Sequence, residues 1–120
     1  MMRPANDLSE IYLCVQPVDF RKGMMSLASL VEGELGMNPF DARLFIFTNR
    51  HRNRVRILYW ERNGFCLWQK RLEKERFHWL KSEDGKALAT IGGQQLNWLL
   101  DGYDIARMKP HKELKYSIVS

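Results

Sequence analysis

The 120-residue sequence lacks the short motifs that identify many enzymes. It has no glycine-rich phosphate loop, no GxSxG nucleophile elbow and no cysteine and histidine set at metal-binding spacing. The histidines, His51, His78 and His111, are scattered, and none has a second ligand at an i, i+4 spacing. These absences argue against P-loop hydrolases, serine hydrolases and zinc enzymes. We expect a non-catalytic protein with no metal and no cofactor.

Long apolar runs and cysteines are also scarce. No apolar run approaches the ~20 residues that cross a bilayer, and the N-terminal segment MMRPANDLSE lacks the apolar core of a secretory signal. We therefore expect a cytoplasmic protein with no membrane contact. Cys14 and Cys66 lie among apolar neighbours in predicted strands, which predicts buried free thiols rather than a disulfide in that compartment.

Five aspartates offer the main alternative to a non-catalytic protein. Asp19, Asp41, Asp84, Asp101 and Asp104 would have to converge as the two-metal carboxylate cluster of a nuclease. The first three occupy predicted cap or loop positions, where aspartate makes local hydrogen bonds, and the last two flank a helix end. The structural interpretation is favoured, and a nuclease is kept as a third hypothesis.

What the sequence does have is an uneven distribution of charge. Residues 43–81 contain 11 Lys or Arg and 3 Asp or Glu, a net charge of +8. The rest of the chain contains 8 and 11, a net charge of −3. The formal +5 of the whole protein therefore comes from this one stretch. A fold does not require such an asymmetry, whereas a polyanionic partner would explain it.

The same stretch contains three segments typical of β-strands, Arg43–Thr48, Arg54–Glu61 and Phe65–Leu72. The polar connectors between them are short, which restricts them to antiparallel neighbours and predicts a three-stranded meander. Large apolar side chains alternate on both faces of the third segment. This pattern predicts a central strand that is covered on both sides.

Two more strands and two helices flank the meander. Short apolar runs predict strands at Ile11–Val15 and Ala87–Ile91. Apolar residues at helical spacing predict a helix along the stripe Phe20–Leu35, with Asp19 as its N-cap and Gly36 as its stop. A second apolar stripe, formed by Leu96, Leu99, Leu100 and Tyr103, predicts the other helix.

Residues 70–81 fit two structures, a strand–turn–strand that ends in Phe77–Leu80 or a short helix, and the first is favoured. Together these elements predict an α+β fold. It would be a mostly antiparallel sheet with a central three-stranded meander and two helices packed on one face. We expect a single domain over residues 1–106, followed by a basic, mobile tail at 107–120.

The basic residues of the meander form two groups. The candidate nucleic-acid-binding residues are Arg50, Arg52, Arg54, Arg56, Lys70, Arg71, Lys74 and Arg76. Extended backbone would project the first four toward one side at about 7 Å intervals, close to the phosphate spacing of a DNA strand. A meander would return the second four beside them. Trp60, Trp68 and Trp79 are interleaved with the basic residues of the stretch, where they would stack on bases or, more simply, fill the core. The competing explanation for the charges is that basic side chains on edge strands prevent aggregation through those edges.

Several segments resemble one known family. They are Pro17-Val18-Asp19-Phe20-Arg21-Lys22-Gly23, Leu44-Phe45-Ile46-Phe47, Arg52-Asn53-Arg54-Val55, Leu58-Tyr59-Trp60, Asn63-Gly64-Phe65 and Leu99-Leu100-Asp101-Gly102. Over about residues 8–105 the chain is similar to the accessory protein from the second open reading frame of the insertion sequence 66 family. This is the TnpB type that is unrelated to the RNA-guided nuclease. The resemblance implies a non-catalytic role in transposition beside a larger catalytic transposase.

Two functional hypotheses follow. In the first, the basic meander binds DNA, either the element ends or a transposition intermediate, mainly through phosphates. In the second, the domain is an adaptor that binds the catalytic transposase without contacting DNA, anchored by Trp60, Trp68 or Trp98. Whether the protein is a homo-oligomer stays open.

Overall fold

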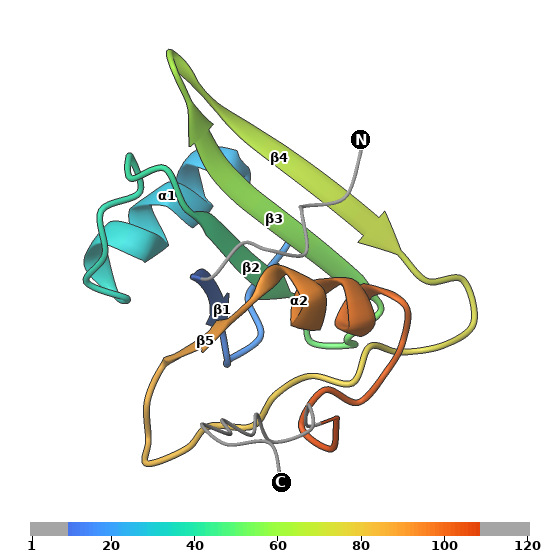
Figure 1. The fold of residues 1–120 in the computed structure, drawn as a ribbon. Helices are drawn as coiled ribbons and strands as arrows, with labels where there is room; N and C mark the ends of the chain where they lie inside the picture. The colour runs from blue at the N-terminus through green and yellow to red at the C-terminus, as the bar shows by residue number, and fades with distance from the viewer. Residues whose placement is uncertain (1–9, 109–120) are drawn as a thin grey trace, which may run out of the picture.

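The computed structural model describes residues 10–108 and shows an α+β fold around one five-stranded sheet (Figure 1). Its elements are β1 (Ile11–Cys14), α1 (Met24–Gly33), β2 (Leu44–Thr48), β3 (Arg54–Glu61), β4 (Gly64–Arg71), β5 (Leu88–Ile91) and α2 (Gly93–Leu100). β1 and β2 are parallel and joined by the crossover through α1, and the other neighbouring pairs are antiparallel. The α+β class is confirmed. Most of the predicted tail, from residue 109 on, lies outside the described residues.

The predicted meander is formed by β2, β3 and β4. However, the strand order is β4-β3-β2-β1-β5, so β4 is an edge strand and the prediction of a central third strand is wrong. β2 is central because the crossover inserts β1 beside it. Both faces of β4 are apolar because Leu67 packs against one core and Trp68 against the other, although both side chains are only half-buried.

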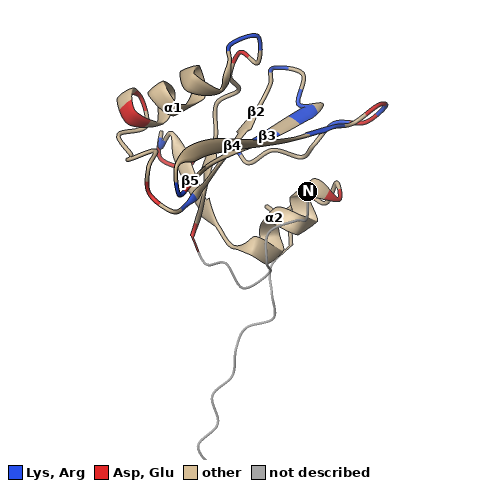
Figure 2. Ribbon diagram, turned by 90° about the horizontal axis from the view of Figure 1, so that it is seen from above, with Lys and Arg blue, Asp and Glu red and all other residues tan. Residues whose placement is uncertain are grey.

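The two helices lie on opposite faces of the sheet, which corrects the prediction that both pack on one face (Figure 2). On the α1 side, Phe45 and Phe47 of β2 pack in a core with Leu27 of α1. On the α2 side, Ile46 packs in a second core with Leu99 of α2. Successive β2 side chains point to opposite faces, so an uninterrupted apolar run needs cover on both.

The first helix starts later than predicted. Its N-cap is Gly23 rather than Asp19, whose carboxylate Oδ1 instead accepts a hydrogen bond of 2.9 Å from the backbone N–H of Arg21. Gly36 has a φ of 64°, the left-handed conformation that suits the predicted stop after a helix. The second helix ends at Leu100, so Tyr103, which is 53% exposed, is not part of its apolar stripe.

The segment between β4 and β5 contains neither the predicted strand Phe77–Leu80 nor a helix. Its side chains nevertheless alternate as a strand's would: Phe77 and Trp79 are buried and His78 is exposed. The indole Nε1–H of Trp79 donates a 2.9 Å hydrogen bond to the carbonyl of Cys14. This segment is extended and belongs to the α2-side core, but it is not paired as a strand.

We expect Trp79→Ala to lower the free energy of unfolding by about 3–5 kcal/mol, the usual cost of deleting a large buried aromatic side chain. Trp79 is only 7% exposed. The adjacent exposed residue gives the control, since His78→Ala should change stability by no more than about 0.5 kcal/mol. Urea denaturation measures both. Equal stabilities for the two variants would show that this segment does not contribute to the core.

Candidate nucleic-acid interface

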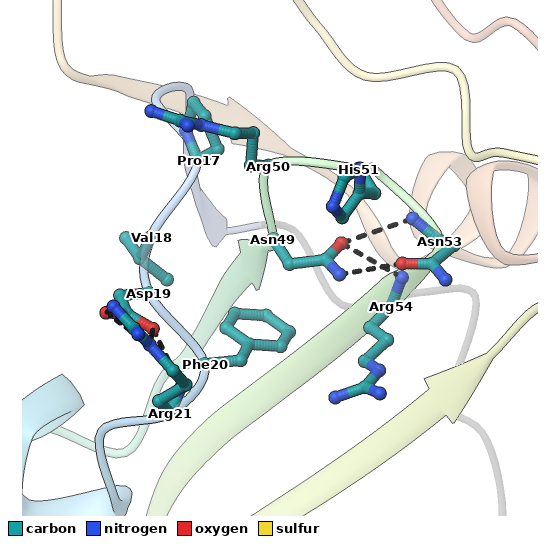
Figure 3. Close-up of a pocket in the computed structure, with 10 residues that line it drawn as sticks. All are labelled: Pro17, Val18, Asp19, Phe20, Arg21, Asn49, Arg50, His51, Asn53 and Arg54. Carbon is teal, nitrogen blue, oxygen red and sulfur yellow. Dashed lines mark hydrogen bonds and ion pairs between the residues drawn. The ribbon is translucent and has the colours of Figure 1, made fainter.

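The β2–β3 turn carries two of the candidate arginines and is closed by the side chain of Asn49 (Figure 3). Asn49 Oδ1 accepts hydrogen bonds from the backbone N–H groups of Asn53 (3.1 Å) and Arg54 (3.2 Å). Arg52 has a left-handed φ of 57°. Arg50 and Arg52 are therefore exposed in a tight turn, and the predicted extended row of four arginines is wrong.

Pairing of β3 with β4 brings two other candidates side by side. Arg54 lies opposite Arg71, on the face of the sheet that α1 covers. Val55 lies opposite Lys70 on the α2 face. The second basic group does return beside the first, as predicted, but Lys70 points to the other face. Opposite side chains in a sheet are about 5 Å apart at Cβ, so the charges of Arg54 and Arg71 repel each other.

Two of the eight candidates are occupied within the fold. Arg56 donates hydrogen bonds to the carbonyl of Phe20 (3.1 Å) and to Gln69 Oε1 (2.6 Å), and its guanidinium lies 4.4 Å from the centroid of the Phe20 ring. Lys70 Nζ donates a 2.7 Å hydrogen bond to the carbonyl of Leu100, at the C-terminus of α2, where positive charge is favoured. These two side chains stabilise the fold and are not free to bind a ligand.

The remaining six candidates are Arg50, Arg52, Arg54, Arg71, Lys74 and Arg76, which we call the basic end. Backbone hydrogen bonds from Leu72 to Asn53 (2.8 Å) and from Phe77 to Arg52 (2.7 Å) hold the loop after β4 against the β2–β3 turn. Figure 2 shows basic segments gathered where β3 begins and β4 ends.

No member of the basic end forms an ion pair within residues 10–108. The ion pairs in this part of the chain are Asp19–Arg21, Glu10–Arg43 and Asp104–Arg107. Glu73 and Glu75 lie in the same loop as Lys74 but do not pair with it. The six basic side chains outnumber these two carboxylates, so this end of the sheet keeps a net positive charge within the described fold.

Arg54 is the least exposed side chain of the basic end. Its Nε is buried without a hydrogen-bond partner in the described structure. Burial lowers the pKa of the neighbouring Arg56, and the positive charge of Arg54 adds to that effect. A buried donor without an acceptor and an adjacent like charge both oppose folding. The structure thus holds Arg54 in a position that costs stability.

An open cavity of about 780 Å³ separates the turn from residues 17–21. The backbone N–H of Val18 donates a 2.9 Å hydrogen bond to the carbonyl of Thr48, which fixes one side of the cavity to β2. Hydrogen bonds from Arg21 lower the pKa of Asp19 to about 2, so the only carboxylate among the described residues that line the cavity is ionised and paired. Arg50 and Arg54 line the same cavity and leave it positively charged.

The tryptophans do not line the basic end, and three of them fill the core, the simpler of the two interpretations of the sequence. Trp68, Trp79 and Trp98 pack in or against the α2-side core. Trp60 contacts two phenylalanines near the opposite end of the β3–β4 hairpin. Among the Phe, Tyr and Trp side chains of the described residues, the one that lines the cavity is Phe20, which the sequence assigned to a helix face. No local signal distinguishes that role, because it depends on Arg56 in a distant strand.

The remaining features concern residues 10–108 only. No three His, Cys, Asp or Glu side chains there are arranged to hold a metal ion, and His111 lies outside this range. Cys14 is buried, which raises the pKa of its thiol, whereas Cys66 is half-buried and therefore more exposed than predicted. Both are free thiols, as predicted. Neither described helix is long and apolar enough to cross a membrane.

We expect Arg54→Met to leave the free energy of unfolding unchanged or to raise it by up to about 1–3 kcal/mol, since it removes a buried unpaired donor. The matched control is Arg56→Met in the same strand. It deletes hydrogen bonds to Phe20 and Gln69 and should destabilise the protein by a similar amount. Urea denaturation compares the two. If both variants are equally destabilised, Arg54 stabilises the fold as Arg56 does, and its burial is not a cost that ligand binding would offset.

Comparison with known proteins gives a family and two relatives. Residues 9–110 match the family described as IS66 Orf2-like protein. The uncharacterized protein y4hO of Sinorhizobium fredii is 36% identical over 103 residues, 86% of this chain and 88% of its own length. The uncharacterized protein y4jC of the same organism is 33% identical over 109 residues, 91% of each chain. No solved structure is a significant match.

The family match spans all the described residues and includes both sides of the cavity and the whole β3–β4 hairpin. It also contains every segment that carries the family resemblance. Both relatives are covered over most of their own length, so the match concerns the whole protein rather than one motif. The chain therefore belongs to the IS66 Orf2-like protein family, whose members have an accessory role in the transposition of insertion sequences.

Proposed function

We propose that this accessory protein acts in the cytoplasm as a DNA-binding component of transposition. The basic end would contact the phosphates of the element ends or of a transposition intermediate. The observation that carries the proposal is the set of six basic side chains with no carboxylate partner in the described fold. Neutralisation by a polyanion would relieve their mutual repulsion and release counterions from the DNA.

The geometry favours phosphate contact over base reading. Arg50 and Arg52 project from a tight turn, and Lys74 and Arg76 lie in an irregular loop, so no helix or paired strand presents them to a groove. Phosphate contacts fix the position of a protein on DNA but carry no sequence information. We therefore expect binding that is sensitive to salt and tolerant of sequence.

The affinity for terminal DNA of the element should fall with salt along a log–log slope of up to about −5, because each of six neutralised phosphates contributes about −0.9. Arg52→Gln with Arg71→Gln should make this slope shallower by about 1.8. The control is Arg62→Gln with Lys81→Gln, which removes the same charge away from the basic end. Arg62 and Arg52 are both left-handed turn residues, with φ of 52° and 57°.

Fluorescence anisotropy over a salt series measures these slopes. A wild-type slope near zero would remove DNA binding as the function. Equal changes in the two double variants would show that net charge, rather than the basic end, determines the affinity. Circular dichroism on each variant checks that its fold is retained.

A second candidate function, an adaptor for the catalytic transposase, is supported by the other end of the β3–β4 hairpin. There Phe40, Trp60 and Phe65 form an aromatic cluster with ring centroids 5.0–5.3 Å apart. Phe40 is 53% exposed. Aromatic side chains of this kind are enriched among the residues that dominate protein interfaces.

The free edge of β4 borders this aromatic cluster. Among the described residues β4 pairs only with β3. Because Leu72 N–H donates to the carbonyl of Asn53, the antiparallel alternation turns the backbone groups of Phe65, Leu67 and Gln69 away from β3. A strand from the transposase, or from a second copy of this protein, would find hydrogen-bonding groups there.

We expect Phe40→Ser to weaken co-purification with the catalytic transposase by roughly 30-fold in affinity, the cost of losing an interface hot spot. The extracts are treated with nuclease so that DNA cannot bridge the two proteins. The control is Met25→Ser, which removes a different apolar side chain that is 64% exposed. Unchanged co-purification of both variants would exclude the aromatic cluster as the contact.

A further inference from the structure

The cavity between residues 17–21 and the β2–β3 turn has a chemistry that phosphate contact alone does not explain. We propose that it holds one unpaired nucleotide of the bound DNA. The phosphate would lie toward Arg50 and Arg54, and the base toward Val18 and Phe20. This inference rests on the proposed DNA binding and deepens it, because it states which form of DNA the protein prefers.

The two sides of the cavity differ in character. Arg50 and Arg54 line it from the turn and β3, and neither has a carboxylate partner in the described fold. Pro17, Val18 and Phe20 line it from the segment before α1 and present mainly carbon. In Figure 3 the Phe20 ring points from that segment toward the turn. The same segment also contributes Asp19 and Arg21, which form an ion pair with each other. Unpaired positive charge on one side and apolar side chains on the other match the two halves of a nucleotide, its phosphate and its base.

The size of the cavity suits a nucleotide and not a duplex. Its volume of about 780 Å³ lies within the range of about 300–1,000 Å³ that is usual for small-ligand sites. A base stacked inside a duplex would have to leave the stack to enter, which costs a few kcal/mol unless it is already unpaired. The cavity therefore selects single strands, overhangs or frayed ends.

Both walls are held in place by contacts within the protein itself. Arg56 is hydrogen-bonded to the carbonyl of Phe20 and covers one face of its ring, and Val18 is hydrogen-bonded to Thr48 of β2. On the other side, Asn49 closes the turn. Residues in fixed walls lose little conformational entropy when a ligand binds, and this favours binding of a specific ligand.

The test compares three DNAs of the same terminal sequence: a blunt duplex, the duplex with a short unpaired overhang, and the single strand. We expect the overhang and the single strand to bind more tightly than the blunt duplex by roughly 5- to 150-fold, the contribution of one accommodated base. Anisotropy at one fixed salt concentration measures the three dissociation constants.

Two substitutions that leave the DNA-contacting arginines intact test the base side. Phe20→Leu keeps an apolar side chain in the core but removes the ring, and His51→Ala removes an exposed ring at the rim of the cavity. In each variant the ratio of the dissociation constants of the blunt duplex and the overhang DNA should fall toward one. The control is His78→Ala, which lies outside the cavity and should keep the wild-type preference.

Photo-crosslinking locates the nucleotide independently of affinity. An iodouracil at the unpaired position should crosslink to residues 17–21 or 49–54. Equal affinity for all three DNAs, or crosslinks only to other segments, would overturn the inference and leave salt-dependent DNA binding intact. No binding to any of the three DNAs would overturn the inference and the proposed function together.

Discussion

The guanidinium of Arg56 joins the sheet to the segment that precedes α1, and the candidate site depends on this link. It donates to the carbonyls of Phe20 and Lys22 and covers the Phe20 ring, while its Nε binds Gln69 of the neighbouring strand. One side chain thus fixes the distance between the apolar wall of the cavity and β3. It also places a permanent positive charge beside Arg54. The shape of the cavity and its electrostatic potential therefore have a common origin.

The same arrangement stores unfavourable free energy at the basic end. Two like charges in water at about 4 Å repel by only ~1 kcal/mol, and the exposed positions of Arg50, Arg52 and Lys74 keep most of this repulsion screened. Arg54 is less well solvated, and its Nε lacks a partner. Local departures of this kind from optimal stability are typical of functional sites. The fold tolerates the charges because the two cores on opposite faces of the sheet supply the stability.

The sequence predicted what local patterns determine. Residue types and short connectors predicted the meander, and the return of its third strand accounts for the position of Arg71 beside Arg54. The face of the sheet on which each helix packs could not be derived in that way, because it depends on the crossover that inserts β1 beside β2. Nor could the role of Lys70, since its acceptor, Leu100, lies 30 residues along the chain. The run Phe45-Ile46-Phe47 did carry a usable signal: three consecutive apolar residues in a strand require cover on both faces.

The two candidate functions occupy opposite ends of one hairpin. β3 runs from Arg54 at the basic end to Glu61 beside the aromatic cluster, a distance of roughly 23 Å at about 3.3 Å per residue. Every residue of β3 is paired with β4, so the hairpin is continuous between the two ends. A ligand at one end would neither cover nor neutralise the other. DNA binding and transposase binding are therefore compatible on this scaffold, and an accessory protein that bridges the two needs no further surface.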